Sequence, residues 1–392
     1  MAESPTAPPR ASVANLFDYP FRIFFLSLAV QAILVVPLWV SIVTGWMNLP
    51  IAGPALAWHQ HEMVFGWLQA AIAGFLLTAV CVWTGTERTH GWRLAGLWAV
   101  WLAGRLLITL GAQVPETVVI GVNLLFLPLV MLDAGARVWK ARQARQIPIL
   151  IVLFALWLMQ AIFLIHGSRT VLDGALVAAM ALMLVIGGRI TPNFSRGWLR
   201  SRNLTTEGIL VLPWLERALL TAMALTFLGV LALPADITGV IALVAGLLAL
   251  VRIGLWRGWR VAREPLLWIL HLSLLWIPIG LWLLAAGRFG ALPETVWTHA
   301  IGLGAMGGLI LGIISRVALG HTGRTLTLPV GMTTAFVLIH AAALARVLTG
   351  AGGMAWQSGI SVSALFWTLA FGLFIYRYCG ILVRPRVDGK PG

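Results

Sequence analysis

The sequence predicts an all-α membrane protein, a single bundle of twelve transmembrane helices. Of its 392 residues, 60% are hydrophobic and only 10% are charged, whereas a soluble domain carries roughly 25% charged residues. The mean hydropathy is +0.93. The apolar residues also fall in long runs, and about 20 such residues are what an α-helix needs to cross ~30 Å of hydrocarbon.

Twelve such runs lie between charged residues and Pro or Gly breaks. The first, residues 23–43, is too long for a signal-peptide core and has no small-residue cleavage site after it, so we expect it to remain as the first helix. Residues 1–21 and 380–392 form tails on either side of the transmembrane domain, residues 22–379. The expected spans are 22–46, 58–83, 92–113, 116–137, 147–166, 169–189, 213–233, 236–256, 265–286, 295–316, 328–350 and 356–379.

Charge distribution predicts the orientation of these helices. The loops after the even-numbered spans and both tails hold most of the Lys and Arg, while the odd-numbered loops offer only Arg169 and Arg288. Cytoplasmic loops carry such an excess, so both termini are expected in the cytoplasm. The net charge of +14 is dispersed among short loops rather than gathered on a soluble face, which excludes nucleic acid as a partner. Cys81 and Cys379 fall on the cytoplasmic side, where thiols stay reduced.

Histidines are the most informative residues of the chain. His90 and His166 fall in loops, whereas the other six lie in spans or at their ends. An ionisable side chain at membrane depth is costly and is by default a functional candidate. Neutral imidazole is a common ligand of copper, zinc and haem iron. The six candidate ligands are His59, His61, His271, His299, His321 and His340.

Depth along the helices divides these six histidines. His59, His61 and His299 begin helices that enter from the outer face, so we expect them to form an outer centre, with His340 as a candidate fourth member. His271 and His321 then hold or support a second cofactor on the inner side. Residues two apart on a helix are separated by about 200°. His59 and His61 are therefore expected to serve two adjacent centres, unless His59 still lies in the loop and both reach one metal.

Charged groups and a thioether accompany the histidines. Glu62 is a candidate catalytic residue, as an acceptor that orients an imidazole or as a proton carrier; the alternative is a carboxylate that snorkels to the interface. Arg105, the second catalytic candidate, and Arg346 lie far from the loops, and a buried guanidinium indicates an anionic partner such as a haem propionate or Glu62. For Arg346 the alternative is a snorkelling side chain. Met63 is either a copper or haem ligand or, more commonly, a packing residue.

One pattern occurs twice. The second and tenth spans both carry His-x4-Gly-x7-Gly, starting at His61 and at His299. Either chance or an internal repeat explains the match. The glycines on the tenth span let helix backbones approach closely or make room for a flat cofactor.

At several motifs the chain resembles the NnrS family, membrane proteins of bacterial nitric oxide metabolism. The resemblance covers almost the whole chain. Thr191 and Asn193 depart from it, since the family more often has an apolar residue before the proline and Phe after it. The matching stretches are Tyr19 to Phe25, Trp58 to Met63, Ala73 to Val80 with Trp83 to Gly85, Leu102 to Arg105, Gly187 to Arg189, and His299 to Gly323.

The resemblance implies haem and copper, association with denitrification, and defence against nitrosative stress, in the inner membrane of a bacterium. No Cys-x-x-Cys-His motif occurs, so one or two haems would be b-type and held noncovalently. We expect an oxidoreductase that binds nitric oxide and reduces or detoxifies it. Membrane quinol is the expected electron donor, because the chain has no soluble electron-carrying domain. A homo-oligomer is left open.

Two other functions stay open at this point. One is a noncatalytic protein that protects against stress by binding nitric oxide or metal. The other is a transporter for a metal or metabolite, since transporters often break helices near the midplane and Pro278 lies within the ninth span.

Overall fold

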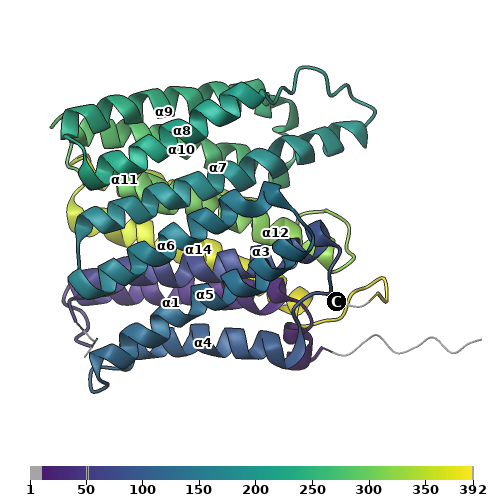
Figure 1. Ribbon diagram of the computed structural model, residues 1–392, viewed down its shortest axis with the longest axis horizontal. Helices are drawn as coiled ribbons and strands as arrows, with labels where there is room; N and C mark the ends of the chain where they lie inside the picture. The colour runs from purple at the N-terminus through teal and green to yellow at the C-terminus, as the bar shows by residue number, and fades with distance from the viewer. Residues whose placement is uncertain (1–10, 50, 52, 391–392) are drawn as a thin grey trace, which may run out of the picture.

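The computed structural model describes residues 11–49, 51 and 53–390, and every regular element in them is helical. Within these residues, twelve helices or runs of consecutive helical segments are long and apolar enough to cross a membrane, which confirms the predicted fold class. They run side by side along the long axis of the bundle (Figure 1). Between α1 and the short α2, the chain turns at one end of this bundle.

The helices follow the predicted spans in order. Three of the spans consist of consecutive helical segments. These are α2, η2 and α3; η3 and α6; and α11, η5 and α12. The bounds are α1 Pro20–Val43, α2 Ala55–His61, η2 Glu62–Trp67, α3 Leu68–Thr84, α4 Gly91–Leu110, α5 Glu116–Lys140, η3 Ala144–Gln146, α6 Ile147–His166, α7 Arg169–Arg200, α8 Pro213–Ala232, α9 Ala235–Leu255, α10 Pro265–Arg288, α11 Val296–His299, η5 Ala300–Gly307, α12 Gly308–His321, α13 Met332–Gly350 and α14 Trp356–Leu382.

Local sequence explains where these helices begin and end. Proline at the first helical position starts α1, α8 and α10, where its missing N–H is not needed. Gly85 and Gly167 end α3 and α6 in left-handed conformations, with φ of 64° and 63°. Residues that carry a side chain rarely adopt this conformation. The largest departure from expectation is α7, which continues to Arg200 instead of ending near residue 189.

Prolines inside helices do not interrupt them. Pro278 lies within α10, which is continuous from Pro265 to Arg288, and Pro192 lies within α7. The feature that favoured a transporter, a helix broken at Pro278, is therefore not found in α10.

Both termini of the described chain meet at one end of the bundle, here called the terminal end. A short 3₁₀ helix, η1 (Val13–Phe17), precedes α1. The amide of Ser12 and the side chain of Asn15 both donate to the Val383 carbonyl, at 3.1 and 2.9 Å. The buried Arg22 guanidinium donates to the carbonyls of Leu382 and Arg384. The opposite end, where α1 turns into α2, is called the far end.

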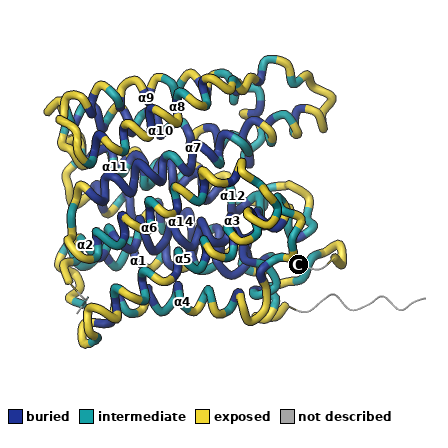
Figure 2. The backbone as a smooth tube through the Cα atoms, in the orientation of Figure 1, coloured by how far each residue is buried: buried dark blue, intermediate teal, exposed yellow. Residues whose placement is uncertain are grey.

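Burial separates a central layer from peripheral helices. The spans formed by α2–η2–α3, by α7 and by α11–η5–α12 bury most of their length, whereas α4, α5 and α6 bury about a third. Figure 2 shows dark blue through the middle of the bundle and yellow along its edges and ends. The two spans with the repeated His-Gly-Gly pattern therefore belong to the core of the bundle.

Candidate functional site

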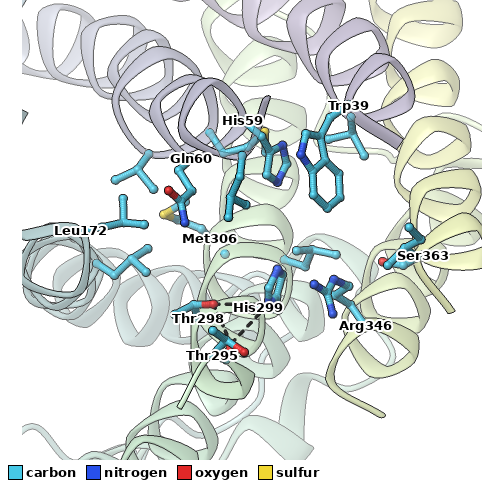
Figure 3. Close-up of a pocket in the computed structure, with 18 of the residues that line it drawn as sticks. Trp39, His59, Gln60, Leu172, Thr295, Thr298, His299, Met306, Arg346 and Ser363 are labelled. Atoms are coloured by element: carbon cyan, nitrogen blue, oxygen red, sulfur yellow. Dashed lines mark hydrogen bonds between the residues drawn. The ribbon is translucent and has the colours of Figure 1, made fainter. Parts of the chain in front are cut away.

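A cavity of about 280 Å³ lies between the central helices near the far end. We call it the His59/His299 cavity. Helices α1, α2, α7, α11, α13 and α14 and the segments η2 and η5 contribute to its wall. Figure 3 shows His59, His299 and Arg346 around it. Its lining also includes Trp39, Met63, Asp173 and Met306.

His59 enters the cavity from α2 with its ring oriented by an aromatic neighbour. The imidazole stacks on Trp39, with ring centroids 4.1 Å apart and planes inclined by 18°. Its Nδ1 is buried and has no hydrogen-bond partner among the described residues. A buried polar nitrogen without a partner is costly, so the position is suited to a ligand that this nitrogen would bind.

His299 enters from α11 and has its tautomer fixed by the backbone. Its Nδ1 lies 3.3 Å from the Thr295 carbonyl oxygen, which only accepts, so Nδ1 carries the hydrogen. The Thr298 hydroxyl lies 3.2 Å from the same nitrogen and itself donates to the Thr295 carbonyl. In the neutral ring, Nε2 then has a free lone pair. Metal-binding histidines almost always show this arrangement of a second nitrogen bonded to a carbonyl or carboxylate.

A charge without a carboxylate partner lies beside these rings. In Figure 3 the Arg346 guanidinium is next to His299. Asp173, the acidic residue among the described lining, pairs instead with Arg288 at 3.4 Å. Arg346 therefore adds positive charge to the cavity. Glu62, one of the two anionic partners suggested for it, pairs with Arg105 instead.

A π-helical segment directly follows the histidine in both matching spans. Segment η2, Glu62–Trp67, follows His61, and η5, Ala300–Gly307, follows His299. Such wide turns are rare and occur often at functional sites. The glycines of the pattern also have matching roles. A Cβ at Gly66 would collide with Arg105 and one at Gly304 with Trp276, while Gly74 and Gly312 allow close packing on α1 and α10. The repeated pattern therefore corresponds to repeated local structure.

His61 lies outside the lining of the cavity, in a network of polar side chains. Its Nδ1 is 3.2 Å from Glu62 Oε1, and its Nε2 is 3.2 Å from the Gln160 side-chain nitrogen. Gln69 donates to the Gln160 oxygen at 2.7 Å. Both nitrogens of His61 thus have protein partners. As the 200° separation predicts, His59 and His61 face different surroundings.

Glu62 and Arg105, the predicted catalytic pair, belong to the same network. Arg105 donates to Glu62 Oε1 at 2.7 Å, and Gln31 donates to Glu62 Oε2 at 2.9 Å. Arg105 also donates to Asn123 at 2.5 Å. Glu62 is 1% exposed, so it is not a carboxylate at the membrane surface. The predicted partnership of Arg105 with Glu62 is present, but neither residue lines the His59/His299 cavity.

The other three histidines lie apart from the cavity. His340 accepts a hydrogen bond from the Trp276 indole at 3.0 Å and lines a groove between α10 and α13. His271 lies 3.0 Å from the Ser195 hydroxyl. His321 packs against the rings of Tyr19 and Phe21. His271 and His321 thus have separate environments. Within the described ranges, no group of three or more His, Cys, Asp and Glu residues is arranged to hold a metal.

The chemistry of the cavity suits copper better than haem. Imidazole binds copper, and soft thioethers such as those of Met63 and Met306 select Cu(I). These two methionines line the cavity together with His59 and His299. Cavities that hold drug-sized ligands measure roughly 300–1,000 Å³, and a haem is larger than most such ligands. At about 280 Å³, the cavity lies just below this range, and a copper ion needs far less space than a haem.

Several residues of the site and its network were not anticipated. Gln31, Gln69, Asn123 and Gln160 are polar side chains within apolar spans, and the criterion applied to the histidines also indicates them. Trp39 and Met306 had no such signal, because both residue types are common in membrane helices for anchoring and packing. Only their contact with the cavity distinguishes them.

Comparison with known proteins agrees with the motifs. A family model described as NnrS protein matches residues 15–386. No curated protein matches the chain. The family match covers all twelve spans and both histidines of the cavity. The chain is a polytopic membrane protein and belongs to the NnrS family.

Proposed function

We propose that this protein is a redox protein that binds nitric oxide at a copper ion in the His59/His299 cavity and reduces it. Membership of the NnrS family favours the bacterial inner membrane, and the Lys and Arg distribution favours an orientation with both termini in the cytoplasm. The observation that carries the proposal is a pair of imidazoles, from two core helices, that line one cavity with two thioethers. Nitric oxide is small, uncharged and soluble in lipid, so a site of this kind needs no polar channel.

Each protein group has a distinct task in this proposal. His59 and His299 bind the metal, and the Thr295 carbonyl holds the His299 tautomer in which Nε2 is free. Trp39 fixes the His59 ring by stacking. A bound copper ion would supply a one-electron couple and a coordination position for nitric oxide. The Arg346 guanidinium stabilises negative charge that develops during reduction.

Reduction of two nitric oxide molecules to nitrous oxide and water consumes two electrons and two protons. We propose membrane quinol as the donor of both. His61 lies on the same helix as His59 and is bonded to Glu62 and Gln160. We propose that this network, which lies outside the cavity lining, delivers protons toward the cavity.

Two measurements test this function. Purified wild-type protein should contain copper, and it should consume nitric oxide anaerobically when reduced quinol is supplied. His59→Ala and His299→Ala should lose both properties, whereas His166→Ala, an exposed histidine, should retain both. Nitric oxide consumption unchanged in both cavity variants would contradict the proposal.

A noncatalytic nitric oxide binder is the second candidate, and one observation favours it. Glu62, the acid closest in sequence to the histidines, is held by Arg105 and Gln31 and does not line the cavity. Asp173, the acid in the described lining, is paired with Arg288. If neither acid gives up a proton, bound nitric oxide is sequestered rather than turned over. Stoichiometric uptake with no nitrous oxide formed would support this alternative.

A further inference from the structure

A second cavity, of about 340 Å³, lies at the terminal end of the bundle, opposite to the His59/His299 cavity. We call it the arginine cavity. It lies where α7, α8 and α9 meet and where the chain enters α6. Its charged lining consists of four arginines, Arg145, Arg189, Arg196 and Arg252, and one carboxylate, Glu216. The lining therefore has a surplus of three positive charges.

The carboxylate is already committed to one of these arginines. Glu216 accepts from Arg252 Nε at 2.7 Å and also pairs with its Nη2. Arg252 is 3% exposed, and its Nη1 has no hydrogen-bond partner among the described residues. Gly188 makes room for this guanidinium, because a Cβ there would collide with it. Gly188 and Arg189 of the Gly187-Gly188-Arg189 motif thus line the cavity from α7.

The remaining three arginines have no negative partner among the described residues. Arg189 donates to the Gln146 amide oxygen at 2.6 Å and to the Arg145 carbonyl, and Arg196 donates to the Ile209 carbonyl at 2.7 Å. All these acceptors are neutral. The Arg145 side chain forms no hydrogen bond with a described residue. Like charges held together at a membrane are stabilised by an anion, and guanidinium groups match the oxygens of a phosphate in pairs.

Apolar residues complete the wall and face outward. Leu220 and Val211 line the cavity and are 38% and 39% exposed. In Figure 1 the end of α7 reaches beyond the neighbouring helices on the side of the bundle that carries the termini. Because a spanning helix of this length leaves the hydrocarbon near its end, we expect the arginines at the depth of lipid headgroups. Basic pockets between transmembrane helices at this depth bind anionic lipid headgroups.

We propose that the arginine cavity binds the phosphate headgroup of an anionic phospholipid, with an acyl chain along the exposed apolar wall. A phospholipid headgroup and free phosphate present the same phosphate oxygens to the arginines. The apolar wall and the headgroup depth favour the phospholipid as the ligand. The site is separate from the His59/His299 cavity and does not depend on the metal.

Binding of defined lipids to delipidated protein in detergent tests this site. Native mass spectrometry should detect one retained phosphatidylglycerol, with phosphatidylcholine of the same acyl chains at least tenfold weaker. Arg145→Gln removes one lining charge without breaking an internal hydrogen bond and should weaken binding about fivefold, since each basic residue near the surface contributes on the order of one kcal/mol. Arg145→Gln combined with Arg189→Gln should weaken it about 25-fold. Thermal unfolding in detergent checks that each variant is folded.

The matched control is Arg200→Gln. Arg200 is exposed and lies on α7, as Arg189 does, but outside the cavity lining. It should leave phosphatidylglycerol binding unchanged. Equal weakening by Arg200→Gln would overturn the proposal, as would equal binding of phosphatidylcholine. Inorganic phosphate that binds as tightly as phosphatidylglycerol would show a free-anion site and would also overturn it.

Discussion

Arg105 Nη1 lies 2.7 Å from Glu62 Oε1 within the membrane-spanning bundle, and both side chains are at least nine-tenths buried. The pair joins α4 to η2, the π-helical segment next to the metal candidates. Gln31 and Asn123 satisfy further polar atoms around it. Gly66 leaves the space that Arg105 occupies. The pair therefore holds the wide turn of η2 against its neighbours.

Glu62→Gln should destabilise the protein strongly, because it leaves the Arg105 charge buried without a counter-charge. Breaking one partner of a buried pair costs about 3–5 kcal/mol. The measurement is thermal unfolding in detergent. Glu294→Gln is the control, since this glutamate pairs near the membrane surface and is half-exposed, where ion pairs contribute about 0–1 kcal/mol. A similar loss of Tm in both variants would argue against a special role for the buried pair.

Gly66→Ala and Gly304→Ala should each destabilise the bundle by about 1–3 kcal/mol, the usual cost of forcing extra volume into a packed interior. The added methyl groups would meet Arg105 and Trp276. Gly302→Ala provides the comparison, because a methyl group added there meets no neighbouring element within 4 Å. It lies on the same π-helical segment as Gly304 and should be neutral or slightly stabilising. Thermal unfolding in detergent measures all three variants, and equal effects at Gly302 and Gly304 would refute this explanation.

His59→Ala and His299→Ala should each lower the affinity for Cu(I) at least tenfold. Both rings line the cavity and have a nitrogen without a hydrogen bond to a described residue. Competition with a chromophoric Cu(I) chelator measures this affinity in purified protein. His90→Ala and His166→Ala should bind copper as the wild type does, because both are exposed. Loss of copper in the exposed variants alone would contradict the assignment.

Arg346→Gln should lower the reduction potential of the bound copper by tens of millivolts. A positive charge beside the metal disfavours the oxidised ion by Coulomb repulsion, so its removal stabilises Cu(II) relative to Cu(I). Spectroelectrochemical titration gives the potential. Arg346→Lys keeps the charge and should change the potential much less. An unchanged potential in Arg346→Gln would show that the guanidinium and the metal do not interact.

The sequence determined the class of protein and the number of spans. Residue composition and runs of about 20 apolar residues dictate helices in lipid, because every backbone polar group there must be bonded internally. The same reasoning identified His59 and His299 as candidates, since a polar side chain at membrane depth is costly and is usually functional. It also predicted an anionic partner for Arg105 and suggested Glu62 or a haem propionate, because an isolated buried charge is costly.

Only the tertiary structure decided how these groups are combined. Positions along separate helices give depth but not rotation or neighbours, so the sequence could not separate His61, bonded to Glu62 and Gln160, from His59, which stacks on Trp39 at the cavity. Nor could it bring Arg252 against Gly188, 64 residues apart. Contacts between helices depend on which faces pack together, and the packing of each face depends on all the neighbouring helices of the bundle.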